Sequence, residues 1–224
     1  MRCLYENTKA RLIYRIFLAL IAVGSFIYSF LGFKPVMLYY TNWSAWFAII
    51  MTFLTLIGTC MSYFSKDERL LDNGVYKLFK FGAAVMIFAT FVVSAFVLPD
   101  KIWTSGFWRP GSTFKHFLLP VFYIADGILC DKRNSYKFSY AFTSLVIPIM
   151  YWVVLILRFM NYRKTCGGAI PEDQWFRYYP YGFCNIDDGH TLTFLICLLA
   201  GIAVALVLTG TVFYFLNKRK AHKK

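Results

Sequence analysis

The sequence predicts an all-α integral membrane protein: a bundle of six transmembrane helices with both termini in the cytoplasm. Hydrophobic residues make up 59% of the 224 residues, and aromatic residues make up 21%. Soluble domains are apolar over only about half of their residues. The mean hydropathy is +0.54. Six apolar stretches are long enough, or nearly long enough, to cross about 30 Å of hydrocarbon as helices.

The expected spans are 12–31, 39–64, 77–97, 114–130, 138–159 and 191–216. The first is too long for the apolar part of a signal peptide, and no small-x-small cleavage site comes after it, so we expect it to be retained. The second opens with YYTNWSAWF, and the fourth is the shortest and most polar. A long outer loop, 160–190, joins the last two. Residues 1–224 are therefore expected to form one transmembrane domain.

The orientation is predicted from the basic residues. With a cytoplasmic N-terminus, the inner side carries twice as many Lys and Arg as the outer side, as the positive-inside rule requires. The tail NKRKAHKK then faces anionic lipid headgroups, which accounts for much of the net charge of +13 without nucleic acid as a partner. A plasma membrane location is expected.

Six cysteines divide by the same topology. Only Cys166 and Cys184 share the outer loop. They form a disulfide if that side is oxidising, and two free thiols are the alternative. No His and Cys spacing typical of zinc is present, and no GxSxG, HExxH, Walker or GxGxxG motif occurs. We therefore expect neither a metal nor a cofactor.

The fourth span contains two ionisable residues, which are expensive in a membrane and indicate function. His116 lies near the outer end and Asp126 about 15 Å deeper along a helix, turned by about 80°. They cannot contact each other directly. His116, Leu119, Tyr123, Asp126 and Cys130 form a slowly winding stripe expected to face the bundle interior.

Pro120 removes the backbone hydrogen bond to the carbonyl of His116 and is expected to kink this helix. The kink would widen the outer end, where a cavity could form. A packing kink with a histidine tucked among helices is the simpler alternative.

The second span begins with polar residues at the same outer depth as His116: Thr41, Asn42 and Ser44. A threonine hydroxyl attacks an ester only if a base takes its proton, and histidine is the commonest base. Thr41 and His116 are thus candidates for a nucleophile and base pair. The simpler explanation of Thr41 is an ordinary helix N-cap or an ordinary residue of a membrane helix.

The outer loop ends in QWFRYYPYGFCNIDDGH. Its aromatic residues are typical of a membrane-interface belt, or of the rim of an acyl-chain cavity. Arg177 could bind a carboxylate or phosphate. Asp187 and Asp188 suit the start of the last helix better than a metal site, because carboxylates favour a helix N-terminus.

Three anchors together resemble the androgen-induced membrane hydrolases and their prokaryotic six-transmembrane relatives: Thr41, the Leu-Pro after His116, and the YPYGF run at 179–183. The resemblance implies an intramembrane hydrolase of fatty acid esters. It implies Thr41 as nucleophile and His116 as base, and a match of Tyr179, Pro180, Tyr181 and Phe183 to the family's aromatic-proline motif. Asp126 also matches a carboxylate after the histidine.

Two functions therefore stand as hypotheses. In the first, the protein hydrolyses lipid esters at a site near the outer leaflet, and membrane lipids or an amphipathic small molecule are its substrates. In the second, it is a non-enzymatic lipid- or solute-binding protein or a proton-coupled transporter. There His116 and Asp126 would form a polar relay, because Asp126 lies too deep to serve an ester at the surface.

Overall fold

The computed structural model describes residues 4–31, 39–92, 94–95, 113–172 and 192–218, and these residues form helices and turns without a β-strand. Five helical stretches are long and apolar enough to cross a membrane. They are Thr8–Tyr28, Tyr40–Ser65, Gly74–Val92, Tyr140–Thr165 and Leu199–Lys218. They are compatible with an integral, multi-pass membrane protein, as the composition predicts.

Four of the expected spans correspond closely to long helices. These are α1 (Thr8–Leu31), α2 (Tyr40–Ser65), α4 (Gly74–Val92) and α10 (Leu192–Lys218). The short elements η1 (Leu4–Glu6) and α3 (Arg69–Asp72) flank them at one end. The helix starting points differ from the prediction by a few residues, because polar residues such as Thr8 continue a helix beyond its apolar part.

The segment predicted as the fourth span is helical but irregular. It begins with a π-helical turn, η5 (Phe114–Leu118), and continues as α6 (Leu119–Leu129). The N–H of Leu119 donates to the carbonyl of Phe114, five residues back. Pro120 comes directly after it and has no N–H to continue an α-helical ladder. Five plus eleven residues rise about 24 Å, so this segment is not among the five long spans.

The predicted fifth span is divided. A single turn, α7 (Tyr140–Thr143), precedes α8 (Val146–Cys166). Pro148 explains the break, because a proline ring collides with the carbonyl four residues earlier, here that of Ser144. At its other end α8 continues past the predicted limit at Phe159 to Cys166, where Gly167 caps it with φ +72°. The loop expected from residue 160 therefore begins later.

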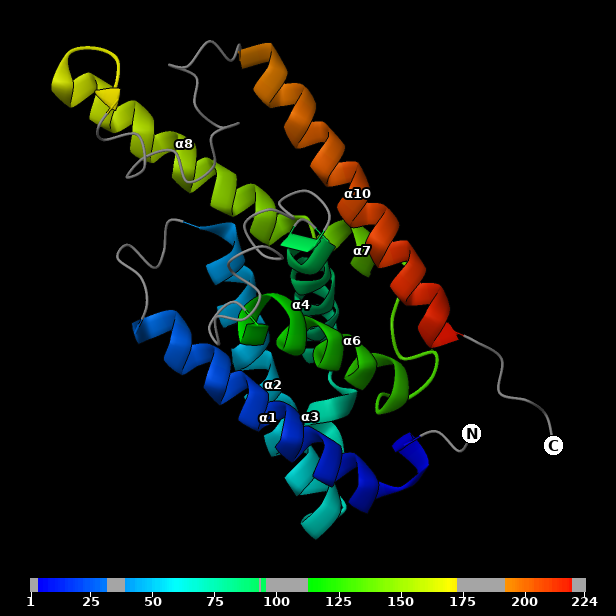
Figure 1. The fold of residues 1–224 in the computed structure, drawn as a ribbon. Coiled ribbons are helices and arrows are strands. Elements are labelled where there is room, and N and C mark those ends of the chain that lie inside the picture. Colours follow the sequence, from blue (N-terminus) through cyan, green and yellow to red (C-terminus); the bar gives the residue numbers. More distant parts are fainter. Residues whose placement is uncertain (1–3, 32–38, 93, 96–112, 173–191, 219–224) are drawn as a thin grey trace.

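Helices α1, α2, α4 and α6 form the tightly packed part of the bundle, and α10 packs against α4 and α7 (Figure 1). The main apolar core lies among them and includes Leu18, Ala45, Phe81 and Leu119, all less than 2% exposed. Helix α8 has few contacts with the other long helices and extends away from them (Figure 1).

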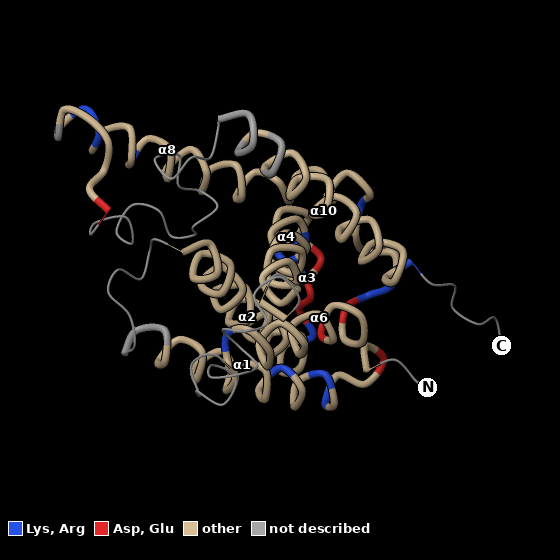
Figure 2. Tube along the Cα trace, turned by 45° about the horizontal axis from the view of Figure 1, so that its top comes forward, with Lys and Arg blue, Asp and Glu red and all other residues tan. Residues whose placement is uncertain are grey.

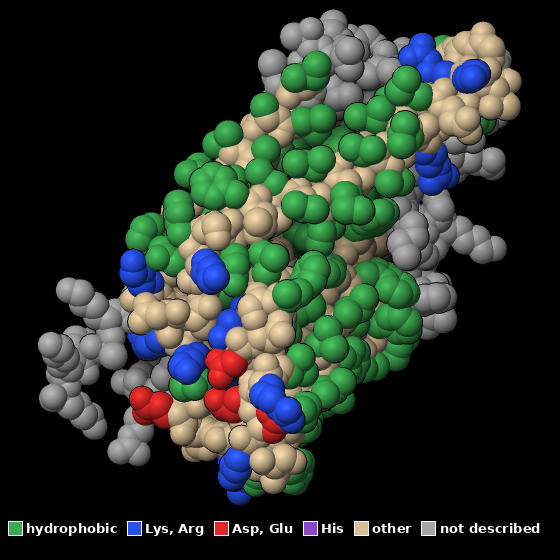
Figure 3. Space-filling view, turned by 180° about the vertical axis from the view of Figure 1, so that it is seen from behind, with side chains coloured by type: hydrophobic (Ala, Val, Ile, Leu, Met, Phe, Trp, Pro, Cys, Tyr) green, Lys and Arg blue, Asp and Glu red, His purple; other side chains and the backbone are tan. Residues whose placement is uncertain are grey.

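The outward faces of the long helices are apolar. Leu20, Leu157, Val204 and Leu208 are each about 60% exposed or more. In Figure 3 hydrophobic side chains cover a broad band, charged side chains gather at one end of the molecule, and a few basic ones lie at the far end of α8. This distribution suits helices surrounded by lipid, with polar ends in the interfaces.

Candidate functional site

Asp126, the deep carboxylate of α6, is held by cations from two other helices. Its side chain is 1% exposed. Nε of Arg15, on α1, donates to Oδ1 at 2.8 Å, and Nζ of Lys80, on α4, donates to Oδ2 at 2.6 Å. Asp126 therefore connects three helices through charge-assisted hydrogen bonds.

Asp131, just beyond the end of α6, completes the group. It accepts from Nη2 of Arg15 at 2.7 Å and from Nζ of Lys80 at 2.5 Å. The hydroxyl of Tyr136 also donates to it. Burial and then the adjacent Asp131 carboxylate raise the pKa of Tyr136 well above its usual value. We call Arg15, Lys80, Asp126 and Asp131 the ionic cluster, which has two positive and two negative charges.

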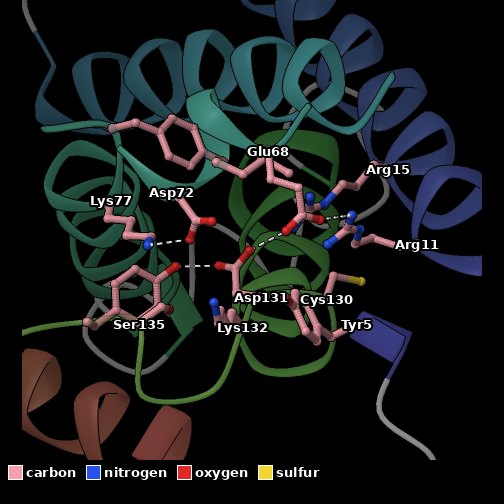
Figure 4. Close-up of a pocket in the computed structure, with 13 residues that line it drawn as sticks. Tyr5, Arg11, Arg15, Glu68, Asp72, Lys77, Cys130, Asp131, Lys132 and Ser135 are labelled. Atoms are coloured by element: carbon pink, nitrogen blue, oxygen red, sulfur yellow. Dashed lines mark hydrogen bonds and ion pairs between the residues drawn. The ribbon is translucent and has the colours of Figure 1, made fainter. Parts of the chain in front are cut away.

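A second layer of polar residues lies beside the ionic cluster. Nη2 of Arg11 donates to Glu68 at 3.1 Å and to Ser62 at 2.7 Å. Burial alone would raise the pKa of Glu68, but the hydrogen bonds from Arg11 and Ser62 outweigh it, and the pKa is lowered. Figure 4 shows Arg11 and Glu68 converging with Asp131 around a pocket. Its volume of about 30 Å³ holds about two water molecules.

The ionic cluster marks one end of the bundle. Figure 2 shows acidic and basic residues gathered near the start of α1, α3 and the end of α6, whereas α10 is almost free of charge until its last turn. Each charge in the cluster has an oppositely charged partner, which is the condition under which buried ions are tolerated.

Sequence reasoning found Asp126 but not its partners. The orientation rule treats Arg15 and Lys80 only as basic residues of the inner side, whereas both side chains are 2% exposed inside long helices. One signal was available. Arg11, Arg15, Leu18 and Ala22 have the helical spacing of a buried face, and all four are buried. An arginine on the buried face of a membrane helix requires a partner of opposite charge, and Asp126 is the acidic residue that lies within a predicted span.

His116, in the π-helical turn, hydrogen-bonds to a serine that sequence analysis did not select. Its Nδ1 lies 2.9 Å from Oγ of Ser94, two residues past the end of α4. Ser94 is 4% exposed. His116 therefore contacts a different residue from those that bind Asp126, which agrees with the predicted separation of the two side chains.

Thr41 lies in the first turn of α2, close to this histidine's neighbours. Nζ of Lys115 donates to Oδ1 of Asn42 at 2.7 Å. Lys115 is adjacent in sequence to His116, and Asn42 is adjacent to Thr41. The segment that carries His116 therefore contacts the turn that carries Thr41. Asn42 is buried and Thr41 is half-buried.

The packing of α2 against α4 brings Ser94 to the same level. Oγ of Ser44 and Oγ1 of Thr90 are 2.6 Å apart, and Ser44 also donates to the carbonyl of Thr41. Thr41 lies about one turn before Ser44, and Ser94 one turn after Thr90. Because the two helices run in opposite directions, both steps lead toward the same end of the bundle. We call Thr41, Asn42, Ser94, Lys115 and His116 the histidine cluster.

Within the described residues, His116 hydrogen-bonds to Ser94, and no hydrogen bond joins it to Thr41. Tyr123 does not belong to the histidine cluster. It is 1% exposed in the core, and its hydroxyl donates to the carbonyl of Lys80 at 3.4 Å. The predicted stripe on the fourth span is confirmed below His116, because Leu119, Tyr123, Asp126 and Cys130 are all buried.

Several predicted residues lie outside the described part of the chain: Arg177, Tyr179, Pro180, Tyr181, Phe183, Cys184, Asp187 and Asp188. Cys166 ends α8, but its side chain is also outside it, so the proposed disulfide stays a prediction. Among the residues that are described, no group of three or more His, Cys, Asp or Glu could hold a metal ion.

Comparison of the chain with models of protein families, with curated proteins and with solved structures found no match.

Proposed function

We propose that this protein is an intramembrane hydrolase of lipid esters in which Thr41 is the nucleophile and His116 is the base. The observation that carries the proposal is the Lys115–Asn42 hydrogen bond. Asn42 follows Thr41 in sequence, and Lys115 precedes His116. The bond therefore brings together the segments that carry the predicted nucleophile and base. The resemblance to the androgen-induced membrane hydrolases supports the same residues.

The chemistry needs few groups. Oγ1 of Thr41 attacks the ester carbonyl while His116 accepts the hydroxyl proton, and the tetrahedral oxyanion then collapses to an acyl-threonine as the alcohol leaves with that proton. Water, deprotonated by His116, then attacks the acyl-threonine, and the fatty acid leaves as His116 returns the proton to Oγ1 of Thr41. Lys115 donates one hydrogen bond to Asn42 and has further N–H donors for the oxyanion.

We also propose that the segment η5–α6 is a sixth crossing and that both termini are cytoplasmic. The turn after α6 contacts both ends of the described chain. Asn217, near the end of α10, donates to the carbonyl of Lys132 and accepts from the N–H of Ser135. Tyr5, before α1, lines the same pocket as Lys132 and Ser135. The two ends thus lie close together (Figure 1), which supports an even number of crossings.

With this topology the histidine cluster faces the outer leaflet and the ionic cluster faces the cytoplasm. The basic residues near the ionic end then agree with the positive-inside rule. A plasma membrane location completes the proposal, and in it membrane lipids would reach Thr41 from the outer leaflet.

The alternative function is lipid or solute binding, or proton-coupled transport, by His116 and Asp126. It requires Asp126 to exchange a proton during a transport cycle. Arg15 and Lys80 both donate to Asp126, so both of its carboxylate oxygens already accept hydrogen bonds from cations. This arrangement supports a structural role for Asp126, and for that reason we prefer the hydrolase.

Covalent labelling tests the proposal. Detergent-purified protein is expected to react with a fluorophosphonate probe at Thr41, and Thr41→Ala and His116→Gln should abolish both labelling and turnover of a lipid ester panel. Thr209→Ala is the matched control, because Thr209 is a half-buried threonine of α10 whose hydroxyl donates to a carbonyl of its own helix. Labelling that persists in Thr41→Ala would move the nucleophile elsewhere. An absence of turnover with every ester in the panel would exclude the hydrolase.

The same preparation tests the alternative. Proton-coupled uptake into proteoliposomes that disappears in Asp126→Asn, with the variant still folded, would favour transport over hydrolysis.

A further inference from the structure

The contact between His116 and Ser94 determines what the imidazole can do. A neutral histidine has one N–H donor and one nitrogen lone pair, and the partner of one nitrogen sets the role of the other. Nδ1 of His116 is the nitrogen that lies 2.9 Å from Oγ of Ser94. Nε2, on the opposite side of the ring, is therefore the nitrogen left to act on a substrate or on a nucleophilic hydroxyl.

We infer that Ser94 is a positioning residue: its hydroxyl oxygen accepts the Nδ1–H of His116, which keeps Nε2 unprotonated as the base. The consequence for catalysis rests on the proposed hydrolase, but the tautomer itself does not. Ser94 would thus take the place that a carboxylate has in a Ser-His-Asp triad, where the third residue orients the histidine and selects its tautomer.

Ser94 uses its hydroxyl differently from Thr90, the neighbouring hydroxyl residue of α4. Helical serines usually donate to a carbonyl in the preceding turn. Thr90, one turn earlier on α4, does this toward the carbonyl of Met86. Within the described residues Ser94 makes no such bond to a carbonyl, and its hydroxyl is directed to His116 instead. The lone pairs of this hydroxyl oxygen are then available to Nδ1–H.

A hydroxyl suits this position better than a carboxylate would. Ser94 is 4% exposed, and the described residues place no carboxylate in contact with His116. A charged partner there would have to be desolvated. The only ion next to His116 in sequence is Lys115, whose ammonium bonds to a neutral amide oxygen. The neutral imidazole is the form that this environment accommodates.

Nuclear magnetic resonance of histidine tests the inference directly. The chain has three histidines, so ¹⁵N-histidine labelling in detergent micelles gives few signals, and His116→Gln assigns the one of interest. We expect the Nδ1–H tautomer for His116 at neutral pH in the wild type and in Ser94→Thr. Ser94→Ala should give a mixture of tautomers. Thr90→Val, which removes a hydroxyl one turn away, should leave the tautomer unchanged.

Two results would overturn the inference: the Nε2–H tautomer in the wild type, or an unchanged Nδ1–H tautomer in folded Ser94→Ala. If Ser94→Ala does not fold, the wild-type tautomer still decides. The first result would mean that Ser94 donates its proton to Nδ1, which would make Ser94 itself a candidate nucleophile.

Kinetics separate this inference from the proposed function. With an active ester substrate, Ser94→Ala should lower kcat by about 10- to 100-fold, which is at most the lower end of what a general base contributes. KM should change little, and Ser94→Thr should recover most of the rate. The predicted tautomer without turnover of any ester would defeat the hydrolase and leave the role of Ser94 intact. Ester turnover together with the Nε2–H tautomer would support the hydrolase and overturn the inferred role of Ser94.

Discussion

At the scale of single residues, Asp126 is explained by its partners. Two cations from α1 and α4 reach it, and neither is near it in sequence. Its position is poorly suited to an ester at the opposite end of the bundle but well suited to joining helices. Removing one partner of such a group leaves buried charges uncompensated, which costs far more than breaking an exposed pair.

Asp126→Asn should therefore lower the free energy of unfolding by about 3–5 kcal/mol, measured by thermal or denaturant unfolding in detergent. Asp72→Asn is the matched control. Asp72 is 45% exposed and forms a salt bridge to Lys77 at 2.9 Å. This pair should contribute about 1 kcal/mol or less to the free energy of unfolding. Equal losses in the two variants would contradict a structural role for the ionic cluster.

Glu68 predicts a dependence of stability on pH. Its pKa in the folded protein is lowered from the usual value of 4.5, because the hydrogen bonds from Arg11 and Ser62 outweigh burial. Its stabilising contribution is thus fully present above about pH 4.5 and is lost as the pH falls through the lower folded value. Glu68→Gln should flatten the stability curve in this acidic range, as measured by unfolding at several pH values. A curve parallel to that of the wild type would argue against the contribution.

At the scale of elements, the π-helical turn Phe114–Leu118 is the feature that sets the direction of His116. One extra residue in a helical turn rotates the segment before the turn by about 100° relative to the segment after it. Pro120 maintains this turn because it offers no N–H for a regular ladder. Sequence analysis predicted an irregularity at Pro120, but its form as a π-turn depends on how Phe114 and Leu119 bond.

Pro120→Ala should permit a regular α-helix and turn His116 away from Ser94. The expected result is loss of the single Nδ1–H tautomer and of esterase activity, with little loss of overall fold. Pro148→Ala, which removes the proline behind the break between α7 and α8, is the control and should leave His116 unaffected. A wild-type tautomer in Pro120→Ala would show that packing alone orients the ring.

At the scale of the whole molecule, polar residues gather at separate ends of an apolar bundle. The ionic cluster joins α1, α4 and α6 at one end, and the histidine cluster joins α2, η5 and the end of α4 at the other. Thr55 and Tyr76 bond at 2.7 Å, beside the charged end. This separation supports a function at one end and a structural connection at the other.

Labelling of single cysteines tests the proposed topology. In a variant without native cysteines, Gly168→Cys should react with a membrane-impermeant maleimide added to intact cells. Lys132→Cys should react only after permeabilisation. Both positions are exposed in the structure, so accessibility within the protein does not limit either one. Labelling of both positions from the same side would rule out six crossings in this arrangement.

Composition and apolar run length were enough to predict the helical class and the approximate bounds of the long helices, because burial in lipid demands apolar stretches of a given length. The stripe through Tyr123 and Asp126 was predicted from helical periodicity alone. Periodicity does not predict which face of which other helix packs against this stripe. The partners Arg15, Lys80 and Ser94 come from segments 111, 46 and 22 residues away from the residues they bond. Only tertiary packing chooses them, since hydrogen bonds and ion pairs act over a few ångströms in space regardless of distance along the chain.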